Sequence, residues 1–128
     1  MPDRFLYEYA VLRIVPRVER EEFMNVGVVL YCPSRGFLAC ISEINGHRLS
    51  AFAPDTDLAE VEDYLNAFRQ ICEGNRQCGS PIAALPVASR FRWLTATRST
   101  VLQTSKVHPG FCTDPEETLK RLFTQQVK

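Results

Sequence analysis

The chain has 128 residues, 45% of them hydrophobic, and its 15 basic and 15 acidic side chains give a formal net charge of zero. A chain of this size buries roughly two thirds of its unfolded surface, so we expect a single domain spanning residues 1–128. Because the charges cancel, no overall electrostatic field attracts nucleic acid or a membrane surface. The sequence also contains no Walker loop, Rossmann glycine pattern or protein-kinase signature.

The five cysteines are odd in number and form no Cys-x-x-Cys motif. Cys32, Cys40 and Cys72 fall within apolar periodic segments, where a free thiol behaves as a small hydrophobic side chain. This pattern indicates a reducing compartment. Asp3 and Glu8 interrupt the apolar run that a signal peptide would need. We therefore expect a cytoplasmic protein with no membrane contact, metal or cofactor.

The first half of the chain is typical of β-strands. Residues 5–15 carry apolar side chains on both faces, which is typical of a central strand. Pro16 ends this strand because it has no amide hydrogen for a continuing ladder. Asn45-Gly46 is a strong signal for a two-residue hairpin, since both residues tolerate positive φ. We expect an antiparallel meander of four strands, at residues 5–15, 23–32, 37–44 and 47–52.

The second half is expected to be mainly helical. Asp57 and Glu60 stand at capping-box spacing before an apolar stripe at intervals of three and four, and Gly74 follows in the position of a left-handed cap. Asp114-Pro115 starts a second helix, with a capping aspartate followed by proline. Between them we expect a loop at 75–88, a helical turn at 89–96 and a fifth strand at 99–105. The expected fold is α+β: a four- or five-stranded, mainly antiparallel sheet packed on one face by two or three helices, the main ones at residues 57–72 and 115–125.

A dense charged segment separates the first two expected strands, with five charged residues between Pro16 and Phe23. Glu22 leads into an apolar strand face, which is costly unless an arginine pairs with it. Gly27 inside a strand indicates close approach by a bulky neighbour, for which we expect Trp93. The structural interpretation, which we favour, is a buried ion pair with an amide tying the loop; the functional one is a polar pocket at the sheet edge. The residues concerned are Arg17, Arg20, Glu22, Asn25 and Gly27.

A second candidate surface is the Arg/Trp segment, which we define as Arg90-Phe91-Arg92-Trp93-Leu94 followed by Arg98 and Ser99. Alternating arginine and aromatic side chains can hold phosphate or stack on bases. They can equally anchor in the core while the arginines pair with acidic residues. Because the chain is neutral, a protein-binding surface is favoured over nucleic acid, since tryptophan and arginine are enriched at binding hot spots.

The remaining chemistry-bearing residues give little support for catalysis or metal binding. His47 and His108 are expected on exposed loops, and neither has a cysteine at zinc-ligand spacing. A nucleophilic Ser99 with His108 as its base is a weak hypothesis, because no nucleophile-elbow motif surrounds Ser99.

Two motif blocks carry a family resemblance. They are Tyr7-Glu8-Tyr9-Ala10-Val11-Leu12-Arg13-Ile14-Val15-Pro16 and Arg20-Glu21-Glu22-Phe23-Met24-Asn25-Val26-Gly27-Val28-Val29-Leu30, supported by the Arg/Trp segment. With them the chain resembles the bacterial domain-of-unknown-function family 3037, over nearly its whole length. The resemblance implies that the gene for this protein often lies next to a gene for a HipA-like serine/threonine kinase. This kinase is therefore a candidate partner. It implies no catalytic residue.

The leading hypothesis is therefore a non-enzymatic protein-interaction module that uses the charged segment and the Arg/Trp segment. The alternative is a binder of phosphate ligands or nucleic acid, or an enzyme acting on them, with an arginine cluster as clamp and Glu22 as base. Both hypotheses expect the arginine-rich second half to fold against the acidic bend near the start, in one polar junction beside the sheet.

Overall fold

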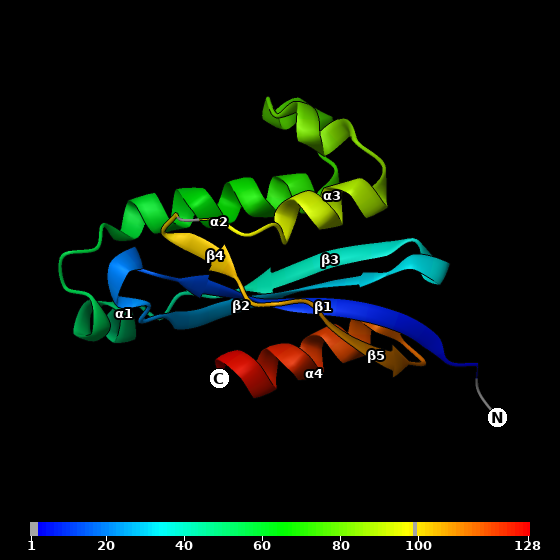
Figure 1. The fold of residues 1–128 in the computed structure, drawn as a ribbon, viewed down its shortest axis with the longest axis horizontal. Coiled ribbons are helices and arrows are strands. Elements are labelled where there is room, and N and C mark those ends of the chain that lie inside the picture. The colour runs from blue at the N-terminus through cyan, green and yellow to red at the C-terminus, as the bar shows by residue number, and fades with distance from the viewer. Residues whose placement is uncertain (1–2, 99) are drawn as a thin grey trace.

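A five-stranded antiparallel sheet forms the centre of the computed structural model, which describes residues 3–98 and 100–128 (Figure 1). The strands are β1 (Phe5–Ile14), β2 (Met24–Cys32), β3 (Phe37–Ser42), β4 (Leu102–Thr104) and β5 (His108–Cys112). The order is β3-β2-β1-β4, and β5 pairs with β1 as well. The helices are α1 (Gly46–Phe52), α2 (Leu58–Glu73), α3 (Val87–Leu94) and α4 (Pro115–Val127), with short 3-10 turns η1 (Val18–Arg20), η2 (Pro33–Arg35), η3 (Arg76–Cys78) and η4 (Pro81–Ala84). The fold class is α+β, as the sequence predicted.

β1 is the central strand, as its two apolar faces predicted. Ala10, Leu12 and Ile14 are buried in the cluster that α2 covers. Tyr7 is buried in the cluster that α4 covers. One edge of β1 pairs with β2, and the other pairs with β4 and β5 in succession. The strand ends at Ile14, two residues before Pro16, because proline cannot extend the ladder.

The two long helices cover opposite faces of the sheet, where the sequence interpretation placed both on one face. Figure 1 shows α2 above the sheet and α4 below it. Val29 of β2 packs in the cluster with α2, whereas Val28 and Leu30 pack with α4. Because β1 and β2 are apolar on both sides, a sheet covered on one side would leave these side chains in water. Burying them requires a helix on each face.

A β-bulge in β2 changes which residues share a face. Leu12 pairs with Gly27 but Arg13 pairs with Asn25, so Val26 is an extra residue. Val26 consequently packs toward α2, whereas Val28 packs toward α4. Simple alternation along the strand, which put both valines on one face, is therefore wrong at this point.

The expected hairpin at Asn45-Gly46 and the strand at residues 47–52 are wrong, because this segment is helix α1. Asn45 has φ −89° and caps the helix, its Oδ1 accepting a hydrogen bond from the Arg48 amide at 3.1 Å. Asparagine is as good a helix N-cap as it is a turn residue, so the pair Asn-Gly did not decide between the two. In contrast, Asp57 caps α2, Gly74 ends it with φ 71°, and Asp114 caps α4, all as predicted.

The segment between α3 and α4 forms two short strands where one longer strand was expected. The expected strand at 99–105 is reduced to β4, and β5 was missed because Pro109-Gly110 indicated a loop. Pro109 is tolerated because β5 is a short edge strand. Gly110 is required there: an added Cβ would lie 2.5 Å from the Tyr7 ring and hydroxyl. None of the helices in the described part of the chain is both long and apolar enough to cross a membrane.

Candidate functional site

The charged bend between β1 and β2 is exposed. Arg20 Nε lies 2.7 Å from Glu22 Oε1, and both side chains are more than half exposed. With Arg17, they line an open hollow of about 300 Å³ against the end of α1 and residues 53–56, which join α1 to α2. The expected buried ion pair at Glu22 is therefore wrong. β2 begins only at Met24, so Glu22 does not lie on the apolar face of the strand.

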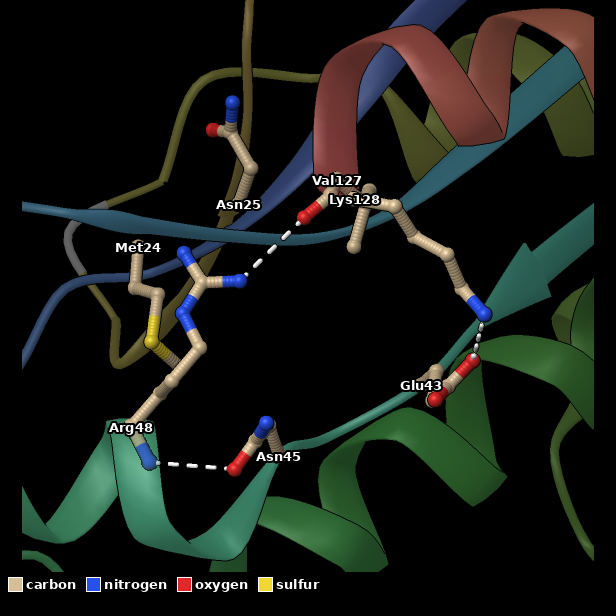
Figure 2. Close-up of a pocket in the computed structure, with 7 residues that line it drawn as sticks. All are labelled: Met24, Asn25, Glu43, Asn45, Arg48, Val127 and Lys128. Carbon is tan, nitrogen blue, oxygen red and sulfur yellow. Dashed lines mark hydrogen bonds and ion pairs between the residues drawn. The ribbon is translucent and has the colours of Figure 1, made fainter.

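Asn25 belongs to a different hollow, of about 260 Å³, at the C-terminal end of α4 (Figure 2). Its Nδ2 donates to the Gln126 carbonyl at 3.0 Å, and Arg48 Nη1 donates to the Val127 carbonyl at 3.3 Å. Opposite them, Lys128 Nζ lies 3.3 Å from Glu43 Oε2. The last carbonyls of a helix have no partner within the helix, so these donors hold the end of α4 to β2 and α1.

This hollow was only partly visible in the sequence. Asn25 was expected to tie backbone by its amide, and it does so, although the carbonyl belongs to α4 and not to the charged bend. Arg48 and Glu43 were missed because no local pattern relates them to a helix end 79 or more residues away. The arrangement is a helix-capping site, with its donors directed at backbone.

Gly27 makes a close approach, but not to Trp93 as expected. An added Cβ would lie 2.6 Å from the carbonyl oxygen of Ile41 and 3.0 Å from Ser42 Cβ. Both neighbours belong to the β3 side of the sheet. Gly27 is therefore required by the pairing of β2 with β3 next to the bulge, and carries no chemistry of its own.

The arginines of α3 bind their own segment. Arg90 Nη1 donates to the Leu85 carbonyl at 2.8 Å, and its guanidinium lies against Gly74, where an added Cβ would be 3.1 Å from Cζ. Arg92 Nη2 is 3.4 Å from the Ser89 hydroxyl within the same helix. Neither side chain forms an ion pair with an acidic residue of the described chain.

Trp93 and Arg98 form a stacked pair at the end of α3. Arg98 Cζ lies 4.2 Å from the centre of the Trp93 ring. Arg98 also donates to the carbonyls of Trp93 and Leu94, and so caps the helix. Partial burial lowers the pKa of the Arg98 guanidinium below its ordinary value. Trp93, 40% exposed, is thus fixed in place while its indole still faces solvent.

An apolar groove of about 190 Å³ runs beside this pair, between α2 and β4. Its walls include Tyr64, Phe68 and Ile71 of α2, Trp93 and Leu94 of α3, and Leu102 of β4. Tyr64, like Trp93, is 40% exposed. Phe68 and Leu94 are buried. The sequence pointed to Trp93 and Arg98, but Tyr64 was missed because it lies beside the apolar stripe of α2 and not within it.

The predicted polar junction between the two halves of the chain does not form. Glu22 pairs with Arg20 of its own bend, Arg98 stacks on Trp93, and Arg90 turns toward Gly74. Asn25 lies at the C-terminal end of α4, and Gly27 lies against β3. Ser99, the remaining predicted site residue, lies outside the described residues. A guanidinium close to backbone carbonyls at a helix end or in a loop bonds to them in preference to a distant carboxylate, so the count of charges did not predict the partners of Arg90 and Arg98.

The histidines and cysteines all lie within secondary-structure elements. His47 lies in α1 and His108 in β5, so the expectation that both lie on loops is wrong, although both are exposed. Cys40 of β3 meets Cys72 of α2. A hydrogen bond from the Cys72 thiol lowers the pKa of Cys40, while the pKa of Cys72 is raised by that bond and by burial.

The comparisons with known proteins agree with the sequence resemblance. No curated protein and no solved structure matches the chain. One family model matches residues 9–127, nearly the whole length, and its description is "Protein of unknown function (DUF3037)". The chain therefore belongs to the DUF3037 family.

Proposed function

We propose that this protein is a protein-interaction module, and that the groove between α2, α3 and β4 is its docking surface. The observation that carries the proposal is Trp93, held by Arg98 at 4.2 Å while 40% of it stays exposed on the wall of an apolar groove. An indole fixed in this way loses little conformational entropy on binding. Tryptophan, tyrosine and arginine are also the residues that dominate binding energy at interfaces.

The occupant we propose is a segment of a partner protein that inserts one large apolar side chain and presents a carboxylate beside it. The apolar side chain fits the walls of Tyr64, Phe68 and Trp93. The carboxylate fits the guanidinium of Arg98, whose lowered pKa reflects a charge that has lost part of its water. An anionic partner group would compensate that loss. The resemblance to the family makes a HipA-like serine/threonine kinase the partner to test first.

The alternative of a phosphate or nucleic-acid clamp has less support. Such a clamp needs arginines that converge on one ligand. Arg17 and Arg20 lie at the charged bend, Arg90 turns toward Gly74, and Arg98 lies apart from them beside the groove. These positions favour an apolar, protein-binding surface over an anion-binding one.

Co-elution of the purified protein with the HipA-like kinase of its host, both folded and at micromolar concentration, tests the proposal. We expect a complex with the wild type, and its loss in the double variant Tyr64→Ala/Trp93→Ala. Truncating one hot-spot aromatic costs about 2 kcal/mol or more, roughly 30-fold in Kd. Phe111→Ala is the matched control, because Phe111 is also exposed and also stacked by an arginine, with Arg4 Cζ 5.1 Å from its ring.

Three results would count against the proposal. The first is the absence of a complex with both proteins folded. The second is a complex that survives the double variant. The third is an affinity that falls steeply with added salt, which would favour the clamp.

A further inference from the structure

The outer edge of β3 is open. Among the described residues, β3 pairs with β2 alone, and every residue of Phe37–Ser42 is only half-buried. Proteins usually protect such an edge with lysine, proline, a bulge or an inward-pointing charge. The strand Phe-Leu-Ala-Cys-Ile-Ser has no charged residue and no proline. It is therefore a ready template for another strand.

The pairing with β2 fixes which backbone groups of β3 point outward. Glu43 donates its amide hydrogen to the Val26 carbonyl at 2.8 Å, and Ile41 stands opposite Val28 in the same register. In an antiparallel ladder the bonded residues alternate along the strand. Ala39, Ile41 and Glu43 thus bond inward, and the amides and carbonyls that point to the free edge belong to Leu38, Cys40 and Ser42.

We propose that this edge pairs with the same edge of a second copy of the chain, around a two-fold axis at Cys40. Cys40 then stands opposite Cys40 of the second copy, and Leu38 opposite Ser42. Each of these pairs exchanges two hydrogen bonds. The register joins residues that share a face, so α2 lies on the same side of the sheet in both copies, and a continuous sheet results.

The charges beside the edge favour a second copy over a foreign strand. Arg69 and Glu73 of α2 are both more than half exposed, with Nη1 3.8 Å from Oε1. Cys40 of β3 packs against the cluster that contains Cys72 of α2, and Arg69 and Glu73 stand on either side of Cys72 in that helix, so both charges lie beside the middle of β3. Arg69 lines a hollow with Ser42 and Leu65, which places it toward the Ser42 end, and Glu73 one turn further lies toward the Leu38 end.

A two-fold axis at Cys40 therefore sets Arg69 of each copy opposite Glu73 of the other. Such self-complementarity is what an interface between identical surfaces requires.

The edge is also accessible. α2 borders β4 through Tyr64 and Phe68 and borders β3 through Leu65 and Arg69, so its axis lies above the middle strands. In Figure 1 the green turns η3 and η4 lie above α2 and α3, away from the sheet. The half-buried residues of β3 agree with an edge that these elements leave open.

Sedimentation velocity from micromolar to millimolar concentration tests the inference. We expect the wild type to dimerise reversibly. Arg69→Glu should raise the dimer Kd about tenfold, because both symmetry-related ion pairs become repulsive. Glu73→Arg should do the same. The charge swap Arg69→Glu/Glu73→Arg should restore the wild-type Kd, since it rebuilds the pairs in reverse.

A wild type that remains monomeric throughout this range overturns the inference. So does a dimer that tolerates both single reversals, or a swap that does not restore it. Circular dichroism shows that each variant is folded, which both exposed positions should permit. The proposal is independent of the groove, so Tyr64→Ala/Trp93→Ala should leave the dimer unchanged.

Discussion

Ser105 closes the gap between β4 and β5, and its replacement by alanine gives the sharpest test of how this edge of the sheet is held together. Its amide donates to the Val11 carbonyl at 2.8 Å, while its Oγ accepts from the Val11 amide at 2.9 Å and donates to the Lys106 carbonyl at 2.9 Å. Ser105 and Val11 are both buried, 6% and 5% exposed. The hydroxyl thus takes the place of the backbone carbonyl that a neighbouring strand would offer to the Val11 amide.

Ser105→Ala keeps the backbone bond but leaves the Val11 amide without an acceptor. A buried donor left unpaired costs about 1–3 kcal/mol. The Lys106 carbonyl adds little, because Lys106 is exposed and water can replace the hydroxyl. We therefore expect the free energy of unfolding to fall by about 1–3 kcal/mol.

Urea denaturation of the variant measures this change directly, with the m-value showing whether unfolding stays two-state. Thr124→Ala is the control, since its exposed hydroxyl only donates to the Lys120 carbonyl within α4, and we expect a change below about 0.5 kcal/mol. If Ser105→Ala lost no more than this control, the Val11 amide would have another acceptor and the reasoning would fail.

Three other substitutions separate the parts of the structural account, each by the same denaturation assay. Gly27→Ala should destabilise the fold by about 1–3 kcal/mol, because the new Cβ would lie 2.6 Å from a backbone oxygen of Ile41. Its control, Gly46→Ala in the first turn of α1, should be neutral or stabilise the fold by up to about 1 kcal/mol. Equal effects of the two substitutions would refute the close approach at Gly27. Glu22→Gln should cost no more than about 1 kcal/mol, since the pair with Arg20 is exposed, and a loss above about 3 kcal/mol would restore the buried-pair interpretation. Asp114→Ala should cost about 1 kcal/mol, because Oδ1 accepts from two amides at the start of α4, and an unchanged midpoint would show that the cap contributes nothing.

The elements predicted correctly are those whose signals lie within a few residues. Pro16 ends β1, and Asp57 and Gly74 bound α2, because capping and proline chemistry act locally. Asn45 failed for the same local reason: its side chain caps a helix as readily as it turns a hairpin, and only burial of Leu49 against the core decides for α1.

The candidate site was harder to predict because its contacts depend on tertiary structure. Trp93 and Arg98 were identified from residue type, and they do meet. Tyr64 joins them only because α2 packs beside α3, which no sequence spacing encodes. The polar junction failed because arginine has two competing partners, carboxylates and unpaired carbonyls, and at Arg90 and Arg98 the carbonyls were nearer.

The central claim is that Trp93 contacts the bound partner, and fluorine NMR tests it directly. The sequence has one tryptophan, so labelling with 5-fluorotryptophan gives one resonance, from Trp93 in the groove. On titration with the unlabelled HipA-like kinase, we predict that this resonance shifts or broadens saturably as the complex forms. A complex that forms while the resonance stays unchanged would contradict the account.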